Sequence, residues 1–300
     1  MTLYGLPVLY TLFVWWFSTG AILYLDGLPR RTFRLSMAGA TLLMAGAVYG
    51  LIASQADTSV GGAYAGFTVG LVLWGWLEMA YYMGFMIGPR RDACPEGSRG
   101  LARFGQAVMT TLYHELGALA LAAMIGAVTW DMPNKVALWT FLVLWSMQIS
   151  AKLNVFFGVP NLAESFLPEH LAFLRSFMTR KPMNMFFPVS VTLAIVATTV
   201  LTASAAGATS RFDAVSSTIL ATLMVLAVLE HWFLVVPLPV EALWRWSLSR
   251  RQEDPDGVGS LQSHAETLSH RPAKRRLWGE LFASAPLTQS ATASIARRRP

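Results

Sequence analysis

Six ionisable side chains lie inside stretches of the chain that are otherwise apolar, and their chemistry needs an explanation. A charged group at the centre of a membrane span costs roughly 2.5–3.5 kcal/mol on insertion scales, so each one needs a partner or a purpose. Carboxylates, imidazoles and an amine can together form ion pairs, relay protons or bind a metal ion. The six residues are Glu78, His114, Glu115, Lys152, Glu230 and His231.

The depth of these residues is more informative than their number. At a rise of 1.5 Å per residue, they lie from about 8 Å (Lys152) to about 15 Å (Glu78) from the helix ends that we assign to the cytoplasm. Helices that alternate in direction have no reason to match the depth of their polar groups unless those groups meet. We therefore predict one shared polar site, in which Gln148, one turn before Lys152, and Asn154 complete the hydrogen bonds.

Four interpretations of this site remain open from the residue types. It can be a buried ion-pair network that holds the helices in register. It can be a tetrapyrrole site, because a neutral imidazole can ligate the central metal of a pigment. It can be the proton relay of a transporter, although no repeat symmetry supports this. It can also be a metal centre, although the paired Glu-x-x-His motifs of di-iron bundles are missing; the candidate ligands are then His114, Glu115, Glu230 and His231.

The elements that must position these residues are seven apolar stretches. Each approaches the ~20 residues that a helix needs to cross a bilayer core. The composition agrees, since 54% of residues are hydrophobic and only 13% are charged, which is unlike a water-soluble domain. The sequence predicts an all-α, polytopic transmembrane bundle. The predicted spans are residues 5–25, 35–54, 63–87, 105–129, 136–157, 184–206 and 214–237.

The basic residues predict how the bundle is oriented. If alternate loops face the cytoplasm, twenty of the 23 Lys and Arg residues fall on that side, ten of them from residue 245 onward. Only Lys135 and Arg211 fall on the other side, and Lys152 lies within a span. The positive-inside rule then places the N-terminus outside and the C-terminus in the cytoplasm. Topology accounts for the net charge, so we expect the lipid bilayer as a partner and no nucleic acid.

Two segments outside the spans have patterns of their own. Apolar residues after Pro160 recur at spacings of four, three and four, which predicts a short amphipathic helix over about residues 168–179. It can lie in the membrane interface or pack on the bundle. From about residue 247 to 300 the sequence becomes polar and basic, which predicts a mostly disordered cytoplasmic tail after a bundle of residues 1–246. The apolar residues are Leu167, Leu171, Leu174 and Met178.

Glycines recur at intervals of four on the second and third predicted spans. Such faces allow close approach of two backbones. We therefore expect the second and third spans to form a tight antiparallel hairpin. The residues are Gly46 and Gly50, and Gly62, Gly66 and Gly70.

Four strings of the sequence resemble the PuhE family, a group of photosynthetic complex assembly proteins that are encoded near the reaction-centre H subunit in purple phototrophic bacteria. The resemblance extends from about Met1 to Arg250. The strings are LFVWWFSTGAILYLDGLPRRTFR (Leu12–Arg34), LYHELGALA (Leu112–Ala120), AKLNVFFGVPNLAESFLPEHLAFLRSFM (Ala151–Met178) and LEHWFLVVPLP (Leu229–Pro239).

This resemblance implies a multi-pass protein of the bacterial inner membrane, which is the cytoplasmic membrane or the intracytoplasmic photosynthetic membrane. It implies an assembly factor for reaction-centre and light-harvesting subunits that binds or delivers bacteriochlorophyll or a precursor. The family has no established catalytic mechanism, so no catalytic residue is carried over. The alternatives are an integral-membrane enzyme of tetrapyrrole metabolism with a His/Glu metal site, and a proton-coupled transporter. The candidate ligand or pigment residues are Glu78, His114, Glu115, Gln148, Lys152, Asn154, Glu230 and His231.

Overall fold

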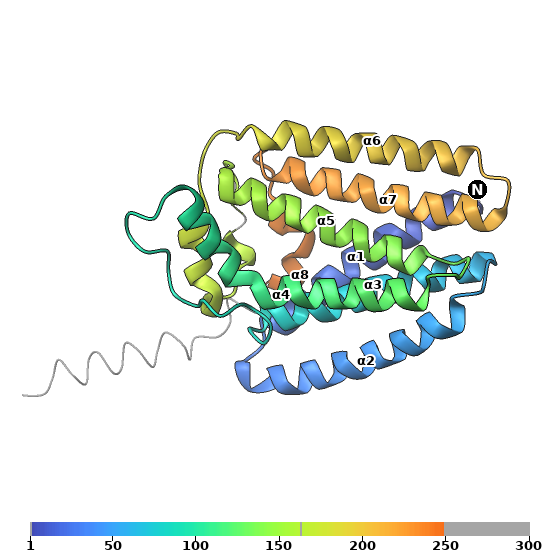
Figure 1. Cartoon of the computed structure of the whole chain (residues 1–300), viewed down its shortest axis with the longest axis horizontal. Helices are drawn as coiled ribbons and strands as arrows, with labels where there is room; N and C mark the ends of the chain where they lie inside the picture. The colour runs from blue at the N-terminus through green and yellow to red at the C-terminus, as the bar shows by residue number, and fades with distance from the viewer. Residues whose placement is uncertain (1, 163, 249–300) are drawn as a thin grey trace, which may run out of the picture. The chain divides into compact units, whose positions relative to one another are not determined.

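The described residues, 2–162 and 164–248 of the computed structural model, form a helical bundle. Its seven long helices are long and apolar enough to cross a membrane, which confirms the predicted fold class (Figure 1). Within these residues the only β-type pairing is an isolated bridge between Val159 and Arg180. The long helices are α1 (Gly5–Asp26), α2 (Phe33–Ser54), α3 (Val60–Tyr82), α4 (Gly100–Val128), α5 (Val136–Phe157), α6 (Phe186–Ala206) and α7 (Arg211–Phe233).

Short helical segments lie between and after the long helices. Three of them begin directly after a proline, at Pro29, Pro168 and Pro239, because proline does not suit a helix interior. A turn also ends α3 five residues before its predicted end, where Gly84 adopts a φ of +83°. The short segments are η1 (Arg30–Thr32), η2 (Glu164–Phe166), η3 (Glu169–Phe177), η4 (Val240–Trp244) and α8 (Arg245–Leu248).

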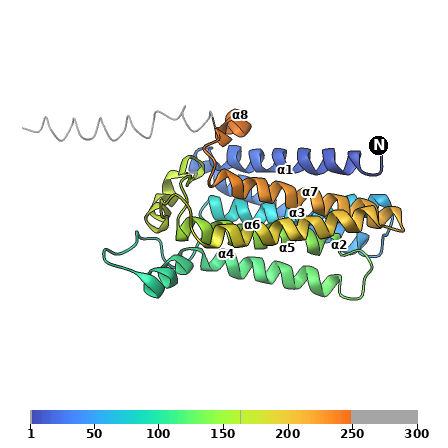
Figure 2. The ribbon, with the colours of Figure 1, turned by 90° about the horizontal axis from the view of Figure 1, so that it is seen from above.

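Helices α3 and α7 form the centre of the bundle. In their most apolar windows, 56% of α3 and 72% of α7 is buried, compared with 11% of the second span. Helix α3 packs against α2 and α5, and α7 packs against α6 and α1. The view from above places α1 and α4 on opposite sides of the bundle (Figure 2). Polar residues on α3 are therefore shielded from lipid by their neighbours.

The glycines of α3 face α5 instead of α2. A Cβ at Gly70 would lie 2.7 Å from the carbonyl oxygen of Ala137, and one at Gly66 would lie 2.9 Å from Cβ of Val136. Helices α2 and α3 do pack side by side, as the sequence predicted, and a Cβ at Gly50 would lie 3.3 Å from the Val69 side chain, but nothing lies within 4 Å of a Cβ at Gly46. The close backbone approach expected between α2 and α3 thus occurs between α3 and α5, which carries Gln148 and Lys152.

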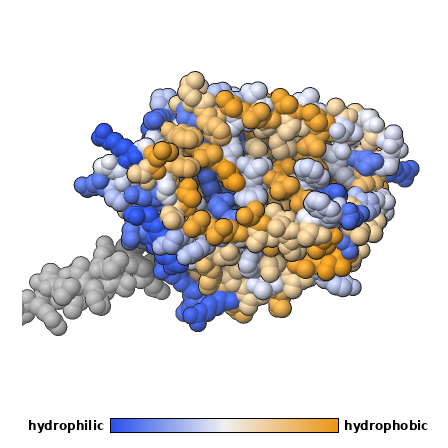
Figure 3. All heavy atoms as spheres, viewed as in Figure 1, coloured by the Kyte–Doolittle hydropathy of each residue, from blue (hydrophilic) through white to orange (hydrophobic). Residues whose placement is uncertain are grey.

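The sides of the bundle expose large apolar side chains. Leu35 and Leu42 on α2 are 77% and 76% exposed, and Leu193 on α6 is 65% exposed. Apolar residues cover much of the face seen in Figure 3, whereas hydrophilic residues gather at the two ends, and more of them at the left-hand end. A water-soluble monomer rarely exposes so much contiguous apolar surface. The surface fits a lipid environment.

The predicted amphipathic helix over residues 168–179 is the 3₁₀ segment η3. Its Leu171, Leu174 and Phe177 are buried, and the two leucines pack with Tyr81 and Ile87 at the end of the bundle. These contacts favour the second of the two placements that the sequence left open. Of the predicted tail, only Ser247 and Leu248 are described, as the end of α8; residues 249–300 lie outside the described residues.

Candidate functional site

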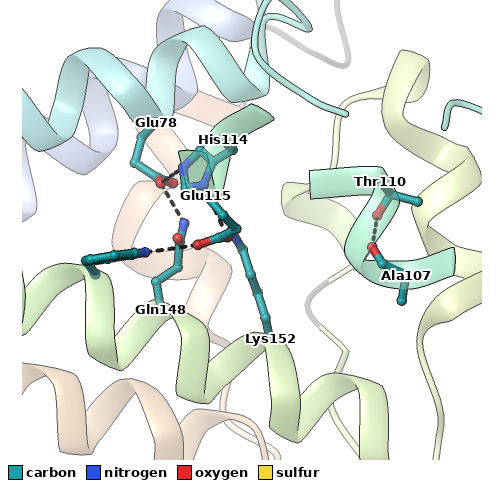
Figure 4. Close-up of polar contacts among 8 residues, drawn as sticks. Glu78, Ala107, Thr110, His114, Glu115, Gln148 and Lys152 are labelled. Carbon is teal, nitrogen blue, oxygen red and sulfur yellow. Dashed lines mark hydrogen bonds and ion pairs between the residues drawn. The ribbon is translucent and has the colours of Figure 1, made fainter. Parts of the chain in front are cut away.

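Five of the eight candidate residues meet between three helices. Glu78 comes from α3, His114 and Glu115 from α4, and Gln148 and Lys152 from α5 (Figure 4). We call these five residues the polar cluster. Its members lie within one network of hydrogen bonds and ion pairs, so side chains that are up to 74 residues apart in sequence (78 to 152) act on one another.

The inner half of the polar cluster is centred on Glu78. Its Oε1 lies 2.9 Å from His114 Nε2 and 2.6 Å from Gln148 Nε2. His114 is fully buried, and Glu78 is 8% exposed. A buried carboxylate is tolerated when donors surround it. The imidazole and the amide supply such donors here, each from a different helix.

The outer half of the cluster is an ion pair between Glu115 and Lys152. Lys152 Nζ lies 2.8 Å from Glu115 Oε1, and the indole Nε1 of Trp145 donates to Glu115 Oε2 at 2.9 Å. His114 Nδ1 lies 3.3 Å from Glu115 Oε1 and 3.4 Å from Lys152 Nζ. The imidazole therefore joins the inner and outer halves of the cluster.

This geometry lets His114 be neutral or protonated without moving. If Nδ1 has no proton, it accepts from the ammonium of Lys152, and the cluster of two carboxylates and one ammonium has a net charge of −1. If Nδ1 is protonated while Nε2 keeps the proton that it donates to Glu78, Nδ1 donates to Glu115 and the net charge is zero. Which nitrogen carries a proton follows from such partners and is not seen directly. The site can thus take up or release one proton in place.

Aromatic rings enclose the imidazole. The rings of Trp74 and Tyr81 lie edge-on to His114, with centroids at 5.9 and 5.0 Å. Tyr81 also presents its face to Lys152 Nζ, at 5.2 Å from the ring centroid. A ring face stabilises a cation at this distance. Tyr81 thus contributes its ring to the surroundings of the polar cluster.

The polar cluster is partly open on the side of α4 and α5. Glu115 and Lys152 keep 25% and 30% of their side-chain surface exposed. Figure 3 shows a small hydrophilic area that interrupts the apolar surface between α4 and α5. Within the described residues, the buried Oε1 of Gln148 has no hydrogen-bond partner. The cluster therefore has accessible charge on its outer side and an unused acceptor.

Helix α4 is interrupted just before the residues that it contributes. The carbonyl oxygen of Ile87 accepts from the backbone N–H groups of Tyr113 and His114, at 3.0 and 3.2 Å. In a regular helix these two groups would bond to the carbonyls of Met109 and Thr110. The segment after α3 thus inserts its backbone into α4, which is a known cause of helix bending.

The carbonyl oxygen of Met109 has a partner outside α4. Met109 O accepts from the backbone N–H of Arg90 at 3.3 Å. Figure 4 also shows the hydroxyl of Thr110 donating to Ala107 O at 2.6 Å. The close approach of the inserted segment to α4 requires a glycine at position 88, because a Cβ on Gly88 would collide with Met109 O. The insertion fixes where α4 directs His114 and Glu115.

The other three candidate residues lie elsewhere. Asn154 donates to Ser190 Oγ at 3.1 Å and accepts from Asn184 at 3.1 Å, so it ties α5 to α6 and to the loop before α6. His231 bonds to Ser150 and Ala227. Glu230 of α7 lies near Trp15 of α1 and interacts electrostatically with Glu78 of the polar cluster. The structure thus places Asn154 and His231 outside the polar cluster, and Glu230 shares no hydrogen bond with it that the structure shows.

Comparison with known proteins places the chain in a family. A family model described as "Protein of unknown function (DUF3623)" matches residues 1–255. The chain belongs to the DUF3623 family. This DUF3623 member is 40% identical over 254 residues to the "Uncharacterized 30.4 kDa protein in puhA 5'region" of Rhodobacter capsulatus, which covers 83% of this chain and 92% of that relative. No solved structure matches this chain.

The donor set of this DUF3623 protein does not fit the metal and pigment sites that the sequence left open. In the described part of the chain, no three His, Cys, Asp or Glu side chains are grouped so as to hold a metal ion. Both ring nitrogens of His114 and both of His231 lie within 3.4 Å of polar protein atoms. Neither imidazole offers a free nitrogen to the metal of a tetrapyrrole.

Sequence reasoning missed two residues that hold these imidazoles and carboxylates in place. Trp145, which bonds to Glu115, lies three residues before Gln148 and seven before Lys152. This spacing places all three side chains on one face of α5, so a signal was present. Ser150, which bonds to His231, gave no comparable signal, because a single serine in a span usually bonds to its own helix.

Proposed function

We propose that the protein is an integral-membrane assembly factor for the bacterial photosynthetic reaction centre and light-harvesting complexes. It acts in the cytoplasmic or intracytoplasmic photosynthetic membrane, with its N-terminus outside and its C-terminus in the cytoplasm. Two observations support this context. The Rhodobacter capsulatus relative is named for its place in the puhA 5′ region, and the sequence resembles PuhE proteins, which are encoded near the reaction-centre H subunit.

The proposal rests on the ion pair of Glu115 and Lys152, which is partly exposed although it lies in the apolar, membrane-spanning part of the bundle. Of the three donors of the Lys152 ammonium, Glu115 and His114 engage at most two. A polar side chain on a transmembrane helix of a subunit gains most from a partner in the membrane, because lipid offers none. We propose that the polar cluster holds such a helix until the subunit enters its complex.

The same geometry argues against an enzyme with a His/Glu metal site and against delivery of a histidine-ligated pigment. An enzyme with a His/Glu metal site needs ligands that converge, and within the described residues no three His, Cys, Asp or Glu side chains are grouped so as to hold a metal ion. Delivery of a pigment ligated by one of the two buried histidines needs a free imidazole nitrogen, which neither His114 nor His231 provides. The proposal therefore rests on side-chain contacts to a protein helix.

Affinity purification from phototrophically grown cells tests the proposal. The tagged wild-type protein should recover reaction-centre or antenna subunits after mild solubilisation. The Lys152→Met variant should recover them at least about fivefold less, because a charged hydrogen bond within a membrane contributes of the order of 1 kcal/mol or more. Lys135→Met, which removes an exposed lysine outside the spans, is the matched control and should recover as much as the wild type.

A deletion strain supplies the second arm. Cells that lack the protein should make normal amounts of bacteriochlorophyll but assemble fewer complexes, which membrane absorption spectra report. Accumulation of a defined tetrapyrrole intermediate would instead indicate an enzyme. Equal recovery of subunits by the Lys152→Met variant and the wild type would refute the role of the polar cluster.

A further inference from the structure

A second polar feature lies outside the cluster, in a cleft of about 380 Å³ at the basic end of the bundle. The cleft lies where η1 and the start of α2 meet the turn after α3 and segment η3. Figure 3 shows hydrophilic residues gathered at the end of the molecule that holds these loops. The cleft is lined by Arg30, Phe33, Met83, Gly84, Ile87, Arg91, His170 and Phe173.

The rim of the cleft is cationic and its floor is apolar. Arg30 and Arg91 are exposed, and neither forms an ion pair with any residue that the structure describes. No carboxylate is among the lining residues. Phe33, Met83 and Ile87 are buried, at 6%, 5% and 3% exposure. The cleft therefore offers two cations above a surface of aromatic and aliphatic carbon.

The inner wall of the cleft is built closely. Gly84 has a φ of +83°, and a Cβ there would lie 3.3 Å from Cδ2 of His170. The imidazole thus packs against backbone that carries no side chain, with the Phe33 ring 6.0 Å away on the other side. A left-handed residue favours glycine. The backbone and the imidazole together fix the shape of the cleft between the two arginines.

We infer that this cleft binds the phosphate group of an anionic membrane lipid. A guanidinium presents paired N–H donors that match phosphate oxygens, and two arginines on one rim match a singly charged phosphodiester. The floor accepts the glycerol and the first carbons of the acyl chains. The inference concerns a different site from the polar cluster and stands whether or not the protein is an assembly factor.

The position of the cleft favours a lipid over a free anion. Its floor consists of residues at the ends of α2 and α3, which is where the hydrocarbon region of a bilayer would give way to headgroups. A small hydrophilic anion gains nothing from the half-buried ring of Phe173, which also lines the cleft, whereas an amphiphile covers this ring and releases water. Basic residues near a membrane surface also attract anionic headgroups electrostatically.

Native mass spectrometry of the delipidated full-length protein in a neutral detergent tests the inference. Phosphatidylglycerol should bind at least about tenfold more tightly than phosphatidylcholine, whose headgroup carries no net charge. The double variant Arg30→Ala/Arg91→Ala should lower the phosphatidylglycerol affinity at least about tenfold. The matched control Arg31→Ala/Arg34→Ala removes two exposed arginines of the same segment that do not line the cleft, and it should bind like the wild type.

Further variants and ligands make each outcome decisive. Arg30→Lys/Arg91→Lys keeps both charges and should retain most of the binding, which separates charge from folding. Equal losses of phosphatidylglycerol affinity in the two alanine double variants would show that only the total charge matters and would contradict the cleft as the binding site. Competition by millimolar inorganic phosphate or glycerol 3-phosphate as strong as that by the lipid would assign the cleft to a free anion, and preferential binding of an acidic peptide would assign it to a protein; either result would overturn a lipid site.

Discussion

The two buried histidines of the bundle lie in contrasting surroundings. His114 is bracketed by two carboxylates and an ammonium, within 2.9–3.4 Å of its ring nitrogens, and the ion pair beside it is partly exposed. His231, which is 1% exposed, has only neutral partners: Nδ1 donates to Ala227 O at 2.8 Å, and Nε2 lies 2.9 Å from Ser150 Oγ. Both imidazoles are satisfied, but only the first belongs to a charged network.

The difference shows how to separate a functional polar site from a structural one in a membrane. A neutral hydrogen-bonded pair costs little to bury and stays satisfied in one protonation state. A charged network that is partly exposed on one side can form further electrostatic interactions with a binding partner. We therefore expect changes around His114 to affect stability and partner binding, and changes around His231 to affect stability alone.

The largest effect is expected from Lys152→Met. It leaves Glu115 without its cation inside the apolar region, and breaking a buried pair in this way costs 3–5 kcal/mol. Because a quarter of Glu115 is exposed, we expect a decrease of about 2–3 kcal/mol in the free energy of unfolding. Unfolding by SDS in mixed micelles measures it. The double variant Glu115→Gln/Lys152→Met should recover most of the loss, and a wild-type value for the single variant would contradict the pair.

Gly88→Ala should be next. Its Cβ would collide with the carbonyl oxygen of Met109, where the segment after α3 enters α4, so either α4 or the segment must shift. Overpacking of this kind costs about 1–3 kcal/mol. Gly105→Ala on α4 is the control, since nothing lies within 4 Å of a Cβ there. Equal stability of the two variants would show that the insertion does not position His114.

A smaller effect is expected at the neutral site. His231→Leu leaves the hydroxyl of Ser150 without its partner, which costs about 1–2 kcal/mol. Replacing both partners, in His231→Leu/Ser150→Ala, should restore much of the free energy of unfolding. Recovery of photosynthetic subunits should be unchanged in both variants. A decrease in the recovery of subunits without a decrease in the free energy of unfolding would show that His231, like His114, belongs to the partner-binding site.

The smallest effect is expected from Trp145→Phe. The variant keeps the ring and removes only the N–H that donates to Glu115 at 2.9 Å. Because Lys152 still holds the carboxylate, we expect a decrease of about 1 kcal/mol in the free energy of unfolding. A decrease as large as that of Lys152→Met would mean that the indole, and not the ammonium, is the main partner of Glu115.

Hydropathy predicted the seven long helices to within a few residues at most ends, because length and apolarity decide what can span a bilayer. The ends that moved depend on local backbone. Gly84 stops α3 early, and α4 begins at Gly100 before its apolar part. Which helices become neighbours could not be predicted in the same way. The glycines of α3 predicted a close helix contact but did not predict that α5 would be the partner helix.

Matching depth found the polar cluster but said nothing about rotation around each helix. Asn154 could have been excluded from the sequence, since two residues after Lys152 it lies about 200° around α5. Glu230 and His231 have a suitable depth, yet α7 turns them toward α1 and Ser150. The interruption of α4 was beyond prediction, because it depends on a carbonyl from a distant loop, at Ile87.

Ile87 belongs to both of the sites that we propose. Its side chain forms part of the floor of the basic cleft, while its carbonyl holds the amides of Tyr113 and His114. A ligand that shifts this residue must also shift the start of the charged network, and a helix bound at the network must in turn alter the cleft. Thermodynamic linkage makes that influence equal in both directions. The lipid composition of the membrane would then tune how firmly the protein retains a subunit.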